Sequence, residues 1–191
     1  MTAEGGRGGP PLALAAVTVL VVALMFGAIA VLLVTGDGAG TGAGPTAPAT
    51  PPTSGEAARQ TARQAISALG ARSIQVIEPQ APYRPAESPT LFSTPRLVLQ
   101  AVLPDDPDGG EFVIYEFATA AAAREAGREY ADYIASGVGR VQFAIGARFV
   151  LRQLGPTLVF FAWSPANDED PRTEEVATAL ATVGEAIPIQ P

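Results

Sequence analysis

Residues 147–164 read ARFVLRQLGPTLVFFAWS, and this stretch decides the fold. Two runs rich in β-branched and aromatic residues flank Gly155-Pro156, which predicts a tight turn between two antiparallel strands, 147–154 and 157–164. A two-residue turn sets the register of the strands, so every cross-strand pair follows from the turn. The expected pairs are Leu154 with Thr157, Arg152 with Val159, Val150 with Phe161, and Arg148 with Trp163.

The two faces of this hairpin differ in polarity, because successive side chains of a strand point to opposite sides. One face is almost wholly apolar and should lie under helices; its residues are Phe149, Leu151, Leu158, Phe160 and Ala162. The other face is mixed, and Glu116 of a neighbouring strand should join it. A candidate interaction face therefore bears Arg148, Arg152, Phe161, Trp163 and Glu116. Large exposed apolar patches are uncommon on monomers, which favours the alternative that a proline-rich segment or the first helix covers this face and leaves the arginines at its rim.

A second hairpin is predicted upstream of the first. Runs 96–103 and 111–117 flank the loop PDDPDGG at 104–110, which is rich in turn-forming residues. If the pleats of the two strands align, one face carries Leu97, Leu99, Val113, Tyr115 and Phe117. The opposite face then carries Gln100, Phe112, Ile114 and Glu116.

Three helices are expected around these hairpins. The spacing Thr53-x-x-Glu56 is typical of a capping box and opens a helix that ends at Gly70, and apolar spacing predicts a second helix over 119–136. Asp170-Pro171 opens a last helix with an apolar face of Val176, Leu180, Val183 and Ile187. With a short strand at 72–77 and an irregular, proline-rich stretch at 78–95, the pattern predicts an α+β domain, 53–191. Its antiparallel sheet has about five strands in two strand-strand-helix units, with helices packed on one face.

An uncharged apolar run precedes this domain. The run covers residues 12–34, which are 23 residues without a charge. A helix of this length would be roughly 34 Å long, enough to cross a hydrocarbon core of about 30 Å. The run predicts a single transmembrane helix. A signal peptide cleaved near Ala28-Ile29-Ala30 is the alternative, but the apolar run continues through Val34 and favours an uncleaved anchor.

The flanks of the run predict its orientation. Arg7 lies on the short N-terminal side, whereas no arginine occurs between Val34 and Arg59. Positive charge favours the cytoplasmic side, so residues 1–11 should be cytoplasmic and 53–191 extracytoplasmic. Residues 35–52 contain mostly Gly, Pro, Thr and Ala, too little apolar surface to order a chain, and are expected to form a disordered linker.

The composition excludes many chemistries. The chain has no His and no Cys, and all 12 of its basic residues are Arg, a usage typical of GC-rich bacterial genomes. Serine or cysteine nucleophiles paired with histidine, Schiff-base lysines, and zinc sites of His or Cys are thereby removed. The net charge of −7 argues against nucleic-acid partners. We expect no catalytic residue, no cofactor and no metal ligand.

Two acidic clusters leave one alternative open. Oxygen-rich loops can hold calcium, although turns of this composition are more often simply solvated. The clusters are Asp105, Asp106, Asp108 and Glu111, and then Asp168, Glu169 and Asp170.

The leading hypothesis is a membrane-anchored, extracytoplasmic, non-catalytic domain that binds a protein or envelope component through its mixed face. One alternative is a small carboxylate-based enzyme or calcium-dependent module acting on envelope polymers, suggested by Glu116 and the acidic clusters. The other alternative is a structural spacer without a ligand.

Overall fold

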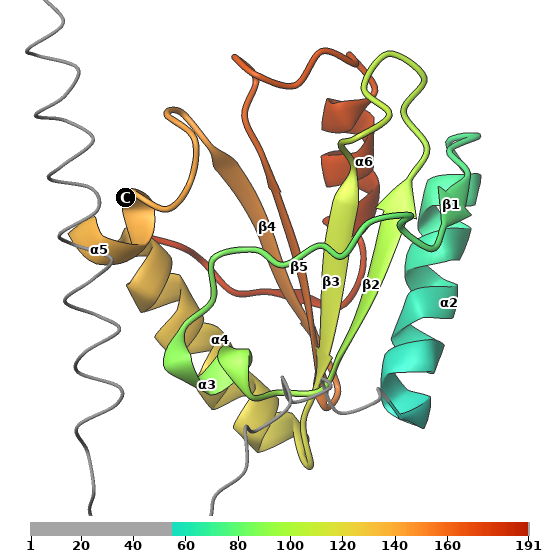
Figure 1. The fold of residues 1–191 in the computed structure, drawn as a ribbon. Helices are drawn as coiled ribbons and strands as arrows, with labels where there is room; N and C mark the ends of the chain where they lie inside the picture. The colour runs from blue at the N-terminus through green and yellow to red at the C-terminus, as the bar shows by residue number, and fades with distance from the viewer. Residues whose placement is uncertain (1–54, 191) are drawn as a thin grey trace, which may run out of the picture. The chain divides into compact units, whose positions relative to one another are not determined.

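The computed structural model describes residues 55–190, which form one antiparallel sheet with helices against both of its faces (Figure 1). The predicted membrane helix 12–34, the linker 35–52 and the capping residue Thr53 lie outside the described residues. Among the helices within 55–190, none is long and apolar enough to cross a bilayer.

The sheet has six strands, so the predicted α+β class is confirmed with one strand more than expected. Every neighbouring pair is antiparallel, and the spatial order is β1-β2-β3-β5-β4-β6. The strands are β1 (Val76–Ile77), β2 (Arg96–Ala101), β3 (Glu111–Glu116), β4 (Arg148–Leu154), β5 (Thr157–Trp163) and β6 (Glu185–Ala186).

The predicted register is right for one hairpin and wrong for the other. All the pairs expected between β4 and β5 are present, from Leu154 with Thr157 to Arg148 with Trp163. In the β2–β3 hairpin, Leu97 lies opposite Ile114 and Leu99 opposite Phe112. Leu97 and Leu99 therefore share a face with Phe112 and Ile114, not with Val113 and Tyr115 as predicted. The long loop between β2 and β3 does not set a register, and a shift of one residue exchanges the two faces.

The mixed face of the sheet is covered by two helices, α2 (Glu56–Gly70) and α6 (Thr173–Leu180). These helices bury the odd-numbered side chains of β5 together with neighbours from β3 and β4. The first core contains Phe112, Ile114, Val150, Val159 and Phe161 from the sheet, and Ala58, Ala62, Ala65, Leu69, Val176 and Leu180 from the helices.

The opposite face is covered by α4 (Ala120–Ala135) and the short α3 (Pro89–Phe92), as the apolar side of the β4–β5 hairpin predicted. The second core includes Val113, Tyr115, Leu151, Leu158 and Phe160 from the sheet and Ala123, Ala126, Tyr130 and Ile134 from α4. The prediction of helices on one face only is therefore wrong. Both faces of β3 and β5 are apolar, which is the pattern of strands buried on two sides.

The C-terminal segment departs most from the predicted helix. Helix α6 ends at Leu180, and Gly184, with a φ of +63°, turns the chain into β6 beside β4. Ile187 consequently packs in the second core, against α4, and not on the helix face with Val183. Gly127 of α4 makes room for it, because a Cβ at that position would lie 2.3 Å from Ile187 Cδ1. Helix α4 ends at Ala135, close to the predicted end at 136, and the short α5 (Gly137–Arg140) follows it.

The proline-rich stretch 78–95 crosses the second face as a strap, held by one buried carboxylate. The Glu87 side chain is 2% exposed and accepts hydrogen bonds from Tyr115 Oη at 2.9 Å, Arg96 NH1 at 2.9 Å and Arg84 Nε at 2.6 Å. Burial raises the pKa of Tyr83 to about 12, and burial also raises the pKa of Tyr115. These phenols stay protonated, so Tyr115 remains a donor to Glu87 at neutral pH.

Candidate functional site

The five residues of the predicted interaction face do share one side of the sheet. Pairing of Glu116 with Thr157 and of Arg148 with Trp163 places all of their side chains on the face of the first core. That face is not open, because α2 and α6 lie over it. Phe161 is 1% exposed and is therefore not free to meet a partner.

The four remaining side chains make contacts within the domain. Glu116 Oε2 accepts hydrogen bonds from the amides of Gly55 (2.8 Å) and Ala58 (2.9 Å), at the start of α2. Arg152 donates to the carbonyls of Val183 and Gly184, just beyond α6.

Arg148 and Trp163 lie at the rim of the first core. Arg148 pairs with Glu174 of α6 on the surface, and the two side chains are more than half exposed. The Trp163 ring stacks on Phe161, with centroids 5.5 Å apart and an interplanar angle of 14°. The arrangement matches the alternative in which the first helix covers the mixed face and leaves arginines at its edge.

Glu116 acts as a cap supplied by a distant strand, which gives a testable expectation. Replacing it by Ala should lower the free energy of unfolding by about 1–2 kcal/mol, since two amides at the start of α2 lose a charged acceptor. Urea titration of the full chain in detergent micelles, followed by the fluorescence of Trp163, measures the change. Glu125→Ala, at an exposed position of α4, is the control; equal effects of the two substitutions would contradict the capping role.

The two acidic clusters come together in space. Burial raises the pKa of Asp106, and the carboxylates of Asp168 and Glu169 raise it further. Asp170, however, serves local structure, since its oxygens accept the amides of Asp105 and Arg172. Within residues 55–190 no three carboxylates are grouped as a metal site would require, so the calcium alternative gains no support there.

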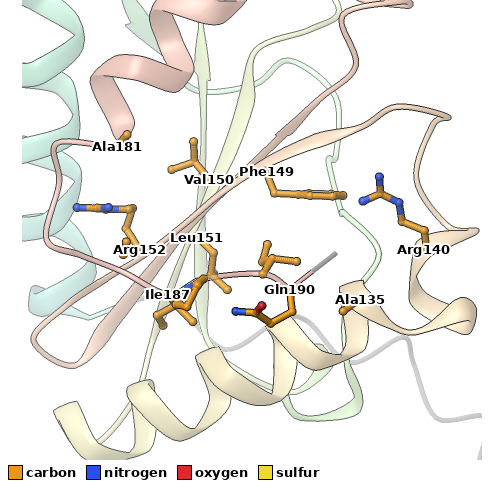
Figure 2. Close-up of a pocket in the computed structure, with 12 residues that line it drawn as sticks. Ala135, Arg140, Phe149, Val150, Leu151, Arg152, Ala181, Ile187 and Gln190 are labelled. Atoms are coloured by element: carbon orange, nitrogen blue, oxygen red, sulfur yellow. The ribbon is translucent and has the colours of Figure 1, made fainter.

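A groove of about 570 Å³ runs along the outer edge of β4 (Figure 2). We call it the β4-edge groove. It is lined from both sides of the strand, with Val150, Arg152 and Ala181 on the side of the first core and the other residues around the second core. Those others are Ala135, Arg140, Phe149, Leu151, Ala186, Ile187, Pro188, Ile189 and Gln190.

The groove exists because β6 covers only part of β4. Strand β6 pairs at Arg152 and Gln153, and the amide of Ile187 donates to the carbonyl of Leu151. Pro188 follows, and a proline has no amide with which to continue a ladder. The backbone amide and carbonyl groups of successive residues in an antiparallel strand point to alternate edges of the strand. Those of Leu151 and Phe149 therefore point away from β5, toward the outer edge of the sheet. Among the described residues, the Phe149 amide and carbonyl and the Leu151 amide have no hydrogen-bond partner.

The segment that contributes Arg140 to the groove also exposes apolar side chains. The segment that connects α4 to β4 carries Val138, Val141 and Ile145, which are 70%, 78% and 96% exposed. Three exposed branched side chains within eight residues of one connecting segment are unusual for a surface that meets only water.

The charge of the groove is opposite to that of the protein. Its described lining contains two arginines and no carboxylate, whereas the whole chain carries −7. Arg152 is occupied by carbonyls, but Arg140 has no carboxylate partner within residues 55–190. Its guanidinium carbon lies 5.3 Å from the centre of the Phe149 ring, and Figure 2 shows the two side chains on the same side of β4.

Comparison with protein-family models, with curated proteins and with solved structures found no match to this chain.

Proposed function

We propose that this protein is a non-catalytic binding domain, held by a single-pass membrane anchor at 12–34 with its cytoplasmic N-terminus, and that it binds an extracytoplasmic protein partner. The uncharged run of 23 residues supports the anchor, and the arginine distribution around it supports the orientation. The absence of His, Cys and Lys supports a role in binding over catalysis.

The observation that carries the proposal is the β4-edge groove. Its unpaired backbone groups can form hydrogen bonds with a partner, and its apolar lining, which includes Phe149 and Ile189, can bury surface with that partner. The mixed face is not retained as the binding surface, since Phe161 is buried and the exposed head of Arg148 is already paired with Glu174.

Site-specific crosslinking tests this function. A photoreactive benzoylphenylalanine at Val141 of the full chain, expressed in its native membrane, should crosslink to a discrete protein. The same group at Ile66, an exposed apolar residue of α2 (43% exposed), should not.

A charge reversal in the groove sharpens the result. Arg140→Glu should suppress the Val141 crosslink, while Arg72→Glu, at an exposed position beyond α2, should leave it unchanged. Crosslinks of equal yield from Val141 and Ile66, or a Val141 crosslink indifferent to Arg140→Glu, would refute the assignment of the binding surface.

A further inference from the structure

Strand β6 demonstrates how a segment adds to the β4 edge. It lies antiparallel to β4, with Gln153 opposite Glu185, and the amide of Ile187 bonds to the carbonyl of Leu151. The next outward position along β4 is Phe149, whose amide and carbonyl stay without a partner because the chain leaves the edge after Pro188. The β4 edge beyond Leu151 is therefore shaped to accept a further strand, whose first paired residue would lie opposite Phe149.

From this geometry we infer that the β4-edge groove takes an extended polypeptide segment as an added strand, with an acidic side chain opposite Phe149 between two small apolar residues. The inference rests on the proposed binding function and names the chemistry of its partner.

The side-chain pattern follows from the pleat. Residues opposite each other on antiparallel strands point to the same face. The partner residue opposite Phe149 therefore faces Arg140, whose guanidinium has no carboxylate within the described chain. A carboxylate there would form a charge-assisted contact at the rim of the groove.

The flanking partner residues point the other way, toward the side of Val150 and Ala181. Figure 2 shows the Val150 side chain directed to that side, away from Phe149. Val150 is 7% exposed and Ala181 is small, so the space there suits Val, Thr or Ala.

Two other occupants fit the groove less well. A second copy of this chain, paired through β4 of each copy about Phe149, would bring two unpaired Arg140 side chains together without a carboxylate. A lipid bilayer would bury the apolar side chains of Val138, Val141 and Ile145. It would also leave the Phe149 amide and carbonyl without hydrogen-bond partners in an apolar medium, which is unfavourable.

Peptide binding to the full chain in detergent micelles tests the inference. The probe is a fluorescein-labelled, end-capped heptapeptide, Ser-Thr-Val-Glu-Val-Thr-Ser, and its affinity is read from fluorescence anisotropy. We expect Arg140→Ala to weaken binding by about tenfold or more, and Arg140→Lys to weaken it less, because a charged hydrogen bond is lost or altered. The control Arg72→Ala should bind as the unaltered chain does.

Changes in the peptide separate the two parts of the inference. A peptide with Gln in place of Glu should lose as much affinity for the unaltered chain as the Glu peptide loses on Arg140→Ala. The Arg140→Ala variant should bind the Glu and Gln peptides with equal affinity. Methylation of the Glu backbone nitrogen should abolish binding, since the donor to the Phe149 carbonyl is removed. Equal binding of the Glu and Gln peptides, or full binding of the methylated peptide, would overturn the inference.

The other occupants are tested with a fluorophore at a single cysteine, Ile145→Cys, in a chain that otherwise has no cysteine. Quenching by nitroxide lipids in nanodiscs would show that a bilayer covers the groove, and self-quenching between labelled copies would show a second copy there. Either result overturns the inference. If Val141 crosslinks a protein partner as proposed while no peptide binds, the binding function stands and the added-strand occupant is wrong.

Discussion

Replacing Glu87 by Ala should destabilise the domain by about 3–5 kcal/mol, because the substitution removes one member of a buried ionic network and leaves the others without their partner. Arg96, whose side chain is 9% exposed, and Tyr115, which is fully buried, both donate to this carboxylate. The strap 78–95 should then detach from the second face. Urea titration followed by Trp163 fluorescence measures the change in the free energy of unfolding.

Two comparisons make the result specific. Glu87→Gln keeps an acceptor oxygen for Tyr115 but loses the charge, so its cost should fall between that of Glu87→Ala and zero. Glu125→Ala, on the exposed side of α4, should change the free energy of unfolding by less than about 0.5 kcal/mol. If Glu87→Ala has as small an effect as Glu125→Ala, the carboxylate does not hold the strap.

Phe160→Ala and Phe161→Ala should each destabilise the domain by about 3–5 kcal/mol. The two phenylalanines are consecutive on β5 and lie in different cores, Phe161 under α2 and α6 and Phe160 against α4. Phe161 is 1% exposed and Phe160 is 0% exposed. Similar losses from neighbouring residues of one strand are the signature of a sheet covered on both faces.

A sheet covered on one face gives a different result. Only Phe160→Ala would then be costly, and Phe161→Ala would resemble the exposed control Ile145→Ala, with a change below about 0.5 kcal/mol. Urea titration of the three variants in the same detergent distinguishes the two arrangements. A small effect of Phe161→Ala would contradict the first core.

How far the sequence predicts this fold depends on how local the determining interactions are. The register of β4 and β5 follows from a turn of two residues, Gly155-Pro156, and the predicted pairs are all present. The register of β2 and β3 depends on a long acidic loop, and its prediction was wrong by one residue, which exchanged the faces of Leu97 and Leu99. Short turns constrain pairing through backbone geometry, whereas long loops leave it to tertiary packing.

The end of the last helix was mispredicted for a similar reason. Val183 and Ile187 continue the helical spacing of Val176 and Leu180, but the positive φ of Gly184 directs the chain to the edge of β4. Ile187 then finds its apolar contacts on the opposite side of the sheet. Apolar spacing alone does not distinguish one helix face from two segments that pack in different cores.

The predicted site residues were correctly grouped, but the sequence did not decide whether their face is open or covered. Strand alternation places Arg148, Phe161 and Trp163 on one face, as expected. Whether a helix covers that face depends on where α2 packs, which no local pattern in the sequence states. The β4-edge groove was missed because its defining feature is the absence of a partner strand beyond Arg152. The segment from Val141 to Ile145 lies outside any strand or helix and exposes two apolar side chains. A search of the sequence for apolar residues outside the predicted strands and helices would have found it.

Amide hydrogen exchange in the free chain, resolved residue by residue by NMR in detergent micelles, tests the open β4 edge most directly. The Phe149 amide faces the groove without a partner, whereas the amide of Val150 belongs to a residue paired with Phe161 inside the sheet. We expect Phe149 to exchange rapidly and Val150 to exchange only at the rate of global unfolding. If Phe149 is as strongly protected as Val150, the edge is already covered in the free protein and no strand can be added there.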